Sequence, residues 1–366
     1  MYIHQTKCWP HFTFDQSVLN TLLSHLRLKQ GRLLGYAASI GFEIQDDAIL
    51  KTITMDVLKS SEIEGILIHP EQVRSSIARK LGLDIGGLIP SDRNVDGMVE
   101  MLLDGTQHYE EKLTKERLLK WHTMLFPTEY SGSYKILVGT WRDDSTGPMQ
   151  VVSGAMGKEK VHFQAPDAPL LENEMLSFLD WFNGEERTDA IIKAGIAHLW
   201  FVTIHPFDDG NGRIARALTD MLLARSEGSP QRFYSMSAQI REQRKQYYDL
   251  LEETQWGNMD ITKWLLWFIN CMDKAIDASN ETLKDTFAKA KFWQNNLSAI
   301  VNERQKFMIN KLLDDFYGSL TSSKWAKMTK SSSDTALRDI QDLISKGILE
   351  KDPETGGRST NYLIKL

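Results

Sequence analysis

Apolar residues recur at helical spacing in the first part of the chain. From Asp15 onward they lie three or four positions apart in two sets, Val18, Leu19, Leu22, Leu23 and Leu26, then Ile49, Leu50, Ile53 and Val57. One face of an α-helix repeats every 3.6 residues, so this spacing predicts an N-terminal helical region. We expect the pattern to be interrupted near Gly31 and Gly35, and a loop over 82–96 to lead to the next helical block near Val99.

The periodicity changes between Gly139 and Pro169. Two adjacent valines at 151 and 152, a turn over 154–157 and an alternating valine and phenylalanine at 161 and 163 predict a short β-hairpin. Helical spacing returns over 170–182, 191–201, after 211 and over 265–272, and a polar helix is expected over 280–290. The middle of the chain therefore reads as a helical core with one inserted hairpin.

The last part of the chain, from Val301, has three helical patterns and two short strands. The strands, at 348–351 and 362–364, flank a turn-rich segment over 352–361. Helices followed by a two-stranded wing describe a winged helix. A chain of 366 residues exceeds the size of one ordinary hydrophobic core, so we predict a mainly α protein of several domains. These are an N-terminal helical region over 1–95, a central core over 96–290 and a winged helix over 300–366.

Composition narrows the function classes. A net charge of −6 and a pI near 5.9 argue against a protein that coats nucleic acid or an anionic membrane through its overall field. Cys8 and Cys271 stand far apart, which argues against a disulfide framework or a structural zinc site. The first residues lack the apolar run of a secretory signal, and no segment is long enough to span a bilayer. We therefore expect a cytoplasmic protein.

The stretch with the most chemical content lies between two apolar helical patterns and reads His205-Pro206-Phe207-Asp208-Asp209-Gly210-Asn211-Gly212-Arg213-Ile214-Ala215-Arg216. Gly210 and Gly212 permit backbone angles that bring successive amides to one point, and the helix beginning at Asn211 offers its unpaired N–H groups there. Such an arrangement binds anions.

The charged residues of the stretch add to this anion site. Arg213 and Arg216 stand three apart, so they project from nearly the same face of the helix and suit phosphate oxygens. Asp209 could hold Mg²⁺ against a polyphosphate, and His205 can accept a proton near neutral pH. A base, a carboxylate and an anion loop together favour transfer of a phosphorus-containing group to an incoming hydroxyl. Each feature alone is common in ordinary structural settings.

The order and spacing resemble the Fic (filamentation induced by cAMP) motif, His-Pro-Phe-x-Asp/Glu-Gly-Asn-Gly-Arg-x-x-Arg, at every fixed position. This resemblance implies a protein adenylyltransferase that moves AMP from ATP to a protein hydroxyl. It implies His205 as the general base and Asp209 as the ligand of Mg²⁺. Gly210, Asn211 and Gly212 would form the anion hole, while Arg213 and Arg216 would contact the β- and γ-phosphates.

A second segment is similar to the inhibitory pattern of the same family. Ser60, Glu64 and Gly65 fit Ser/Thr-x-x-x-Glu-Gly/Asn at the end of a predicted helix. The resemblance implies that Glu64 pairs with Arg216 and blocks the γ-phosphate, as in the class with an N-terminal inhibitory helix. A bidentate carboxylate–arginine pair is credible on electrostatic grounds.

Two further features follow from the resemblance. The hairpin with Val151, Val152 and Ser153 resembles the family's flap, whose exposed edge would dock a target segment by β-addition. Tyr247, in a Tyr-Tyr-x-x-Leu segment, would lie near the nucleotide base, and Gln255 follows where the family often has Asn.

Alternatives remain open at this point. The main hypothesis is an autoinhibited adenylyltransferase that also modifies itself. The others are removal of AMP from modified proteins, transfer of another phosphate-containing group, and a nucleotide-sensing regulator that binds DNA through its winged helix. The segment from Val301 has eleven Lys and Arg against nine Asp and Glu, so DNA binding and protein docking are both open there. A homodimer is plausible by resemblance, and no membrane partner is expected.

Overall fold

The computed structural model describes residues 1–38, 42–83, 86–145, 147–154, 158, 160–185, 188–282, 284–296, 299, 302–313, 316, 319–353 and 360–365. They fall into two compact units. Unit 1 comprises Met1–Tyr36 and Asp46–Glu281, and unit 2 comprises Ala37–Gln45 and Thr282–Leu366. The division of the chain into 1–95, 96–290 and 300–366 stays a prediction.

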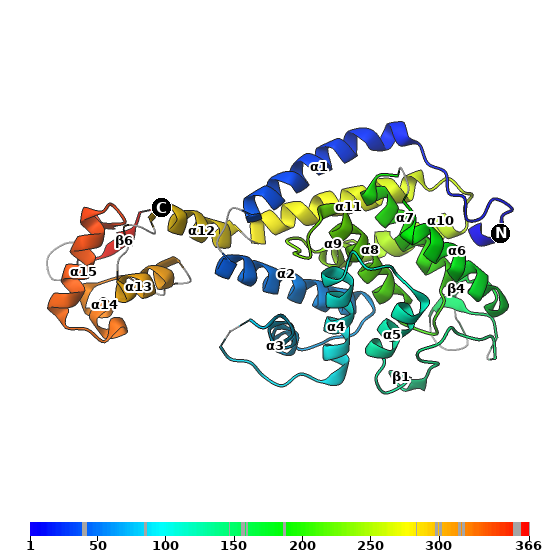
Figure 1. The fold of residues 1–366 in the computed structure, drawn as a ribbon, viewed down its shortest axis with the longest axis horizontal. Helices are drawn as coiled ribbons and strands as arrows, with labels where there is room; N and C mark the ends of the chain where they lie inside the picture. Colours follow the sequence, from blue (N-terminus) through cyan, green and yellow to red (C-terminus); the bar gives the residue numbers. More distant parts are fainter. Residues whose placement is uncertain are drawn as a thin grey trace. The chain divides into compact units, whose positions relative to one another are not determined.

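Helices build most of unit 1 (Figure 1). They are η1 (Ile3–Gln5), α1 (Gln16–Ala38), α2 (Phe42–Ile63), α3 (Pro70–Leu81), α4 (Arg93–Gln107), α5 (Lys115–Leu125), η2 (Ala168–Leu170), α6 (Leu171–Asn183), α7 (Ala190–Ile204), α8 (Asn211–Glu227), α9 (Met236–Glu242), α10 (Arg244–Gln255) and α11 (Thr262–Thr282). Two short antiparallel hairpins interrupt them. These are β1 (Tyr130–Ser131) with β2 (Tyr134–Lys135), and β3 (Gln150–Ser153) with β4 (Lys160–Gln164).

Helix α7 lies at the centre of unit 1. It is apolar on every side, as a helix buried all round must be. Gly195 allows α11 to approach closely, since an added Cβ there would lie 3.0 Å from Leu265 and 3.1 Å from Phe268. Trp264 donates an indole hydrogen bond to the Gly195 carbonyl oxygen at 2.8 Å, which fixes the two helices against each other. The loop that leaves α7 therefore starts from a rigid base.

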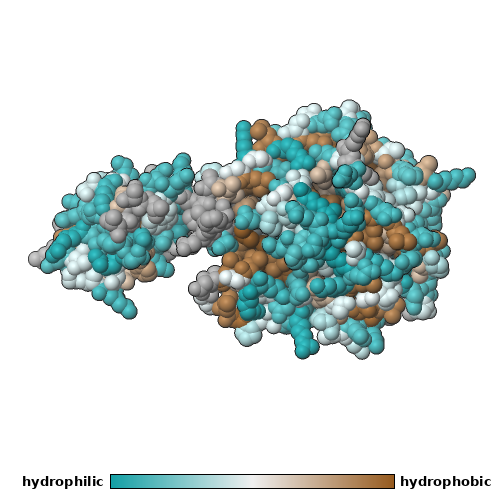
Figure 2. Space-filling model, in the orientation of Figure 1, coloured by the Kyte–Doolittle hydropathy of each residue, from teal (hydrophilic) through white to brown (hydrophobic). Residues whose placement is uncertain are grey.

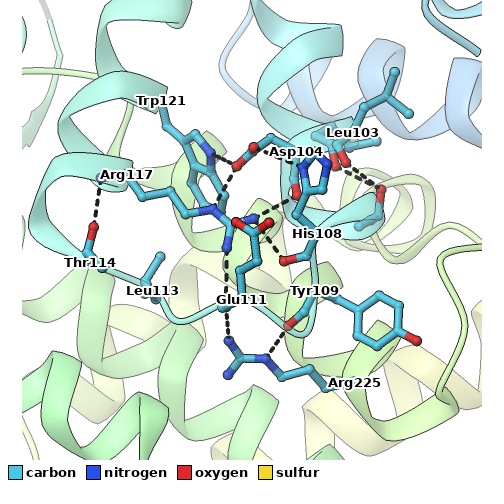
Figure 3. A network of polar contacts seen from close by, with 12 residues as sticks. Leu103, Asp104, His108, Tyr109, Glu111, Leu113, Thr114, Arg117, Trp121 and Arg225 are labelled. Atoms are coloured by element: carbon cyan, nitrogen blue, oxygen red, sulfur yellow. Dashed lines mark hydrogen bonds and ion pairs between the residues drawn. The ribbon is translucent and has the colours of Figure 1, made fainter.

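Two arginines tie the segment between α4 and α5 to the rest of unit 1 (Figure 3). Arg117 donates from Nε to Asp104 Oδ2 at 2.7 Å, and Trp121 donates to the same oxygen at 2.6 Å. Arg225, near the end of α8, donates to the carbonyl oxygens of Tyr109 and Glu111 at 2.5 and 2.8 Å. The bonds to Asp104 join α5 to α4, and the bonds from Arg225 give the two loop carbonyls a partner, so α4, α5 and α8 are held as one block.

The predicted hairpin of the middle region is confirmed as β3–β4, and part of its turn, 155–157, lies outside the described residues. The break expected near Gly31 and Gly35 is wrong, because α1 continues through both. A glycine costs a helix about 1 kcal/mol, which burial of Leu19, Leu26 and Leu33 outweighs. The second block begins earlier than Val99, because Asp92 caps α4 by accepting from the Val95 backbone N–H at 2.9 Å.

The helices and strands of unit 2 are α12 (Lys284–Asn296), α13 (Glu303–Leu313), α14 (Ser322–Thr329), α15 (Ser333–Ser345), β5 (Leu349–Lys351) and β6 (Tyr362–Ile364). Helices α13 to α15 and the hairpin β5–β6 lie where three helical patterns and two strands were predicted, and α12 precedes that segment. Trp325, Ile340 and Leu343 lie fully buried in its core. Strands β5 and β6 pair antiparallel, and an isolated bridge joins Leu320 to Tyr362. Residues 354–359 of the predicted turn segment lie outside the described residues.

Hydrophobic and hydrophilic side chains are interspersed on the face of the molecule in Figure 2. Among the helices that the structure describes, none combines the length and apolar character needed to cross a membrane.

Candidate active site

The candidate site is the loop that joins α7 to α8. Helix α7 ends at Ile204, and His205 caps it with a left-handed backbone of φ 52° and ψ 58°. Pro206 follows and cannot donate to the helix, so the chain turns away. Gly210, with φ 85°, makes a second left-handed turn, and α8 begins at the next residue, Asn211. The loop therefore connects two packed helices through two left-handed residues.

Asn211 closes this loop. Its Oδ1 accepts from the Phe207 backbone N–H at 3.0 Å, and its Nδ2 donates to the Phe207 carbonyl oxygen at 2.8 Å. Phe207 is fully buried and stacks on His122 with ring centroids 4.1 Å apart. The side chain of Asn211 thus shapes the loop, and only its backbone N–H is available for the predicted anion hole.

His122 supports the loop from α5 and was not predicted from the sequence. Its Nδ1 accepts from the Gly139 backbone N–H at 3.3 Å, so its Nε2 donates to the Asp209 carbonyl oxygen at 3.2 Å. Burial lowers the pKa of His122 to about 4, which keeps the ring neutral at pH 7. A lone histidine on an amphipathic helix carries no sequence signal of this role.

Arg142 is a second supporting residue that the sequence did not reveal. Its Nε donates to the His205 carbonyl oxygen at 2.8 Å, and its backbone N–H donates to the Pro206 carbonyl oxygen at 3.0 Å. The buried guanidinium also donates to the Pro166 carbonyl oxygen at 2.5 Å and pairs with Asp144 at 3.2 Å. Arg142 therefore ties the turn at His205 to the segment that follows the β3–β4 hairpin.

The imidazole of His205 is oriented for proton acceptance. Its Nδ1 lies 3.2 Å from the Val202 carbonyl oxygen, an acceptor, so Nδ1 carries the proton and Nε2 keeps its lone pair. Burial lowers the pKa of His205 below the ordinary value, and the charge of Arg142 acts in the same direction. The ring is thus held neutral at physiological pH, the state that a general base requires.

Unpaired donors gather beside His205. The backbone N–H groups of Asn211, Gly212 and Arg213 belong to the first turn of α8, where no intrahelical acceptor exists. In the described part of the chain, the buried Arg213 Nε and Arg216 Nη1 have no hydrogen-bond partner. The Arg213 guanidinium lies over the Phe126 ring, 4.8 Å from its centroid. Buried donors without acceptors are rare, so this set fits a polyphosphate.

Asp209 supplies a carboxylate next to these donors, directly before Gly210. Its Oδ1 accepts from the Gly210 backbone N–H at 2.5 Å, its Oδ2 accepts from the Ser131 hydroxyl, and its side chain is 43% exposed. Across the described residues there is no cluster of three metal-binding side chains. One accessible carboxylate beside a polyphosphate fits Mg²⁺, which usually takes few protein ligands and keeps substrate oxygens and waters.

Glu64 lies over the anion loop at the end of α2. Its Oε1 accepts from Arg216 Nη2 at 2.7 Å, while Ser60 accepts from Arg216 through Oγ at 2.8 Å and through its carbonyl oxygen at 3.0 Å. A Cβ built on Gly212 would lie 2.4 Å from Glu64 Oε1, so the carboxylate rests directly on the backbone of the loop. The structure therefore brings the predicted residues Ser60, Glu64 and Arg216 together.

The structure places Tyr247 in the core. It is 2% exposed, and its hydroxyl lies 2.9 Å from Nε2 of the buried His198. Gln255 is also buried and donates to Thr203 at 3.2 Å. The neighbouring Tyr248 is 36% exposed instead. The predicted contact of Tyr247 with a nucleotide base therefore finds no support in its side-chain position, and Tyr247 instead packs behind Arg216.

The predicted flap residues lie on β3. Val152 is 48% exposed and Val151 half-buried, with a register shift between them. The Ser153 hydroxyl lies 2.6 Å from His162 Nε2, and His162 Nδ1 lies 2.5 Å from Glu252 on α10. This chain of contacts anchors the hairpin to unit 1 while its outer strand stays exposed.

The loop lies inside a segment that is similar to a known family. Residues 112–223 match the Fic/DOC family, and residues 2–83 match a domain of unknown function, DUF4172. A segment of 117 residues, 31% of the chain, is 37% identical to the protein adenylyltransferase Fic of Nematostella vectensis. Another of 105 residues, 28% of the chain, is 35% identical to that of Drosophila grimshawi. These segments cover only 25% and 20% of those two relatives.

Solved structures show the same fold. A Fic family protein from Desulfovibrio desulfuricans G20 aligns with a TM-score of 0.60 at 19% identity, over 97% of this chain and 98% of that one. A Fic domain containing signaling protein from Bacteroides thetaiotaomicron VPI-5482 aligns with a TM-score of 0.51 at 22% identity, over 75% of this chain and 96% of that one. The fold is therefore the mainly helical Fic fold with small β-hairpins. Residues 112–223 are therefore similar to the Fic/DOC family and residues 2–83 to DUF4172, and the chain has a distant, partial similarity to the Fic adenylyltransferases.

Proposed function

We propose that the protein transfers AMP from ATP to a hydroxyl group of a target protein, and that Glu64 holds this activity low. One observation carries the proposal. The free Nε2 of His205 stands at the mouth of a loop whose helix N-terminus and two buried arginine nitrogens lack acceptors. Such a site supplies both a base and a receptor for phosphate oxygens.

The proposed step forms one bond to phosphorus and breaks another. The target hydroxyl oxygen attacks the α-phosphorus of ATP while His205 Nε2 accepts its proton. The bond from the α-phosphorus to the bridging oxygen breaks, and pyrophosphate leaves. The N–H groups of Asn211, Gly212 and Arg213 hold the phosphate oxygens as negative charge moves across them. When bound by Asp209, Mg²⁺ would neutralise part of that charge.

The inhibitory role of Glu64 follows from its contacts. A carboxylate that pairs with Arg216 and rests on Gly212 places negative charge where the proposal puts a phosphate. ATP must therefore either displace Glu64 or bind with its terminal phosphates misplaced. Removing Glu64 takes away this negative charge and leaves Arg216 Nη2 bonded to the Ser60 carbonyl oxygen alone at 3.0 Å, without changing His205 or the loop.

The test compares the wild type with Glu64→Gly, each incubated with Mg²⁺ and ATP labelled on the α-phosphate or the γ-phosphate. Breaking a hydrogen-bonded charged contact of about 1.5–3 kcal/mol should raise transfer of the α-label to protein by roughly 10- to 100-fold. No γ-label should be transferred. Covalent label is measured on the enzyme itself and on a cell lysate from which nucleotides have been removed.

Glu62→Gly is the matched control. Glu62 lies on the same helix end but pairs with Lys59 at 2.8 Å and Arg241 at 3.4 Å, away from Arg216. It should leave the label near the wild-type level. Transfer of the γ-label would contradict the proposal. If no variant transfers label but the wild type removes AMP from a modified protein, Glu64 activates water and the reaction is AMP removal.

The target hydroxyl is proposed to arrive along β3. Strand β3 pairs with β4 along one edge, and its Val152 is 48% exposed. An extended target segment can therefore add to the other edge of β3. The segment would then pass in front of His205, because Arg142 links that turn to the hairpin's end at Pro166.

DNA binding by unit 2 is a second candidate function, favoured by one observation. Helices α14 and α15 are joined by residues 330–332, the short turn of a helix-turn-helix. Helix α15 buries Ala336 and Ile340, which leaves Arg338 and Gln341 exposed on its other face. Arginine and glutamine side chains read guanine and adenine edges in the major groove.

The second candidate predicts that the full chain retards random-sequence duplex DNA in a gel at low salt. Replacing Lys327 and Lys330 by alanine should weaken binding, and the slope of log K against log salt should fall by about 0.9 for each phosphate that is no longer neutralised. Lys263→Ala, in unit 1, is the control. Absence of retardation at about 50 mM salt, where such binding is strong, would exclude this function.

A further inference from the structure

The β1–β2 hairpin and the segment that follows it contact both acidic residues of the loop. The Ser131 hydroxyl of the hairpin donates to Asp209 Oδ2, and the Leu137 backbone N–H, after the hairpin, donates to Asp208 Oδ2 at 2.8 Å. The Gly139 N–H donates to His122, which in turn holds the Asp209 carbonyl oxygen. Residues 130–139 therefore hold both carboxylates by one hydrogen bond each, and they have no part in the base or anion chemistry described above.

The contacts of Asp209 show what Ser131 does there. Gly210 holds Oδ1 through its N–H, and Ser131 holds Oδ2. A carboxylate accepts about four hydrogen bonds, so lone pairs remain on both oxygens of this partly exposed side chain. Arg213 Nη2 lies 3.8 Å from Asp209 Oδ2, too far for a hydrogen bond but near enough to compete for that oxygen.

Among the described residues, only the Ser131 hydroxyl donates to Oδ2, so without it Oδ2 is no longer held away from Arg213. The terminal torsion of aspartate is broad, so the carboxylate can turn toward the guanidinium and form a closer ion pair. That pair would neutralise the charge that a cation needs and occupy an arginine that a phosphate needs. A single serine therefore decides whether the two side chains stay separately available.

We propose that Ser131 is a positioning residue for the Mg²⁺ carboxylate. It holds Asp209 turned toward the cation and away from Arg213, and it touches neither the reacting atoms nor the base. This inference rests on the proposed function, because it assigns a role within the same metal–nucleotide site. Removal of an outer-shell partner of a metal ligand typically lowers metal affinity by roughly 10- to 100-fold.

The experiment measures metal binding directly, in the Glu64→Gly background so that Glu64 does not cover the loop. Mn²⁺ replaces Mg²⁺, because it suits the same oxygen ligands and its free concentration is read by electron paramagnetic resonance. Titrations are run with a non-hydrolysable ATP analogue. Four proteins are compared, namely the Glu64→Gly parent and the same chain with Ser131→Ala, Ser131→Thr or Ser133→Ala. Ser133 is exposed in the same hairpin and serves as the matched control.

Ser131→Ala should weaken Mn²⁺ binding to the protein–nucleotide complex by roughly tenfold, while Ser131→Thr and Ser133→Ala stay near the parent. Binding of the analogue without metal should be the same in all four. With Asp209→Ala added, Ser131→Ala should have no further effect, because the ligand it positions is gone. Thermal melting of each variant confirms that it is folded.

Two results would overturn the inference. One is Mn²⁺ affinity in Ser131→Ala equal to that of Ser133→Ala. The other is an equal loss of metal-free analogue binding, which would mean that Ser131 merely shapes the loop. If the parent transfers the α-label and only the Ser131 comparison shows no difference, this inference fails alone. A parent that binds no nucleotide with metal overturns the proposed function as well.

Discussion

Replacing His205 with alanine in the Glu64→Gly background is expected to lower AMP transfer by roughly 10²- to 10⁴-fold, the usual contribution of a positioned general base. The cause is the loss of the Nε2 lone pair, which the bond from Nδ1 to the Val202 carbonyl oxygen keeps free. Binding of ATP and Mg²⁺ should change by less than about threefold, since the anion loop donates through backbone N–H groups and arginines.

The measurement pairs the initial rate of α-label transfer with the equilibrium affinity for a fluorescent ATP analogue. His25→Ala, on the exposed face of α1, is the control and should match the parent in both. A loss of rate accompanied by an equal loss of affinity would show that His205 supports the loop rather than the chemistry. An unchanged rate would remove the base from the mechanism.

The rate of AMP transfer at acid pH is a second test of His205 as the general base. Because burial lowers the pKa of His205, transfer by the parent should fall only below the ordinary histidine pKa of about 6.5.

The residues of the candidate loop could be grouped from the sequence because they are contiguous. His205 to Arg216 carries a histidine, carboxylates, glycines and arginines within one turn and one helix, so spacing alone places them together. Arg142, His122 and Ser131 could not be found in this way. Each is a single polar residue in a segment without a characteristic pattern, and each acts through a hydrogen bond to a residue more than 60 positions away.

The glycines of α1 show why a local pattern can mislead. Gly31 and Gly35 carry a real local cost, but the buried leucines on the same helix decide the outcome. Tertiary packing there overrides a signal that spans only a few residues. Tyr247 is a different case, because its side chain faces His198 and the core while its proximity to a nucleotide base stays a prediction.

A buried charge cluster joins helix α2, which carries Ser60 and leads to Glu64, to the far end of α8. Arg232 pairs with Asp220 at 3.1 Å and with Glu227 at 3.7 Å, and all three side chains are at most 2% exposed. Asp56 on α2 accepts from the Ser235 hydroxyl at 2.6 Å, three residues beyond Arg232. One buried guanidinium therefore balances carboxylates from two helices.

Arg232→Met is expected to lower the free energy of unfolding by about 3–5 kcal/mol, because it leaves buried carboxylates without their counter-charge. Urea denaturation at pH 7.5 measures the loss. Arg241→Met is the control, since Arg241 is 43% exposed and its pair with Glu62 at 3.4 Å should contribute less than about 1 kcal/mol. Adding Asp220→Asn to Arg232→Met should restore part of the stability.

The loss should also depend on pH in a definite direction. Burial raises the pKa of Asp56 and of Asp220, and the charge of Asp56 adds to the rise for Asp220. The folded protein therefore prefers these carboxyls protonated, so the stability they contribute is full below the ordinary Asp pKa of about 3.9 and is lost as pH rises through the folded pKa. Without Arg232 both pKa values rise further, and the deficit of Arg232→Met should shrink as the pH is lowered from 8 toward 5. A loss of unfolding free energy that stays constant from pH 8 to pH 5 would mean that lost packing around the guanidinium, rather than unpaired charge, causes the instability. The cluster would then not couple α2 to α8 electrostatically.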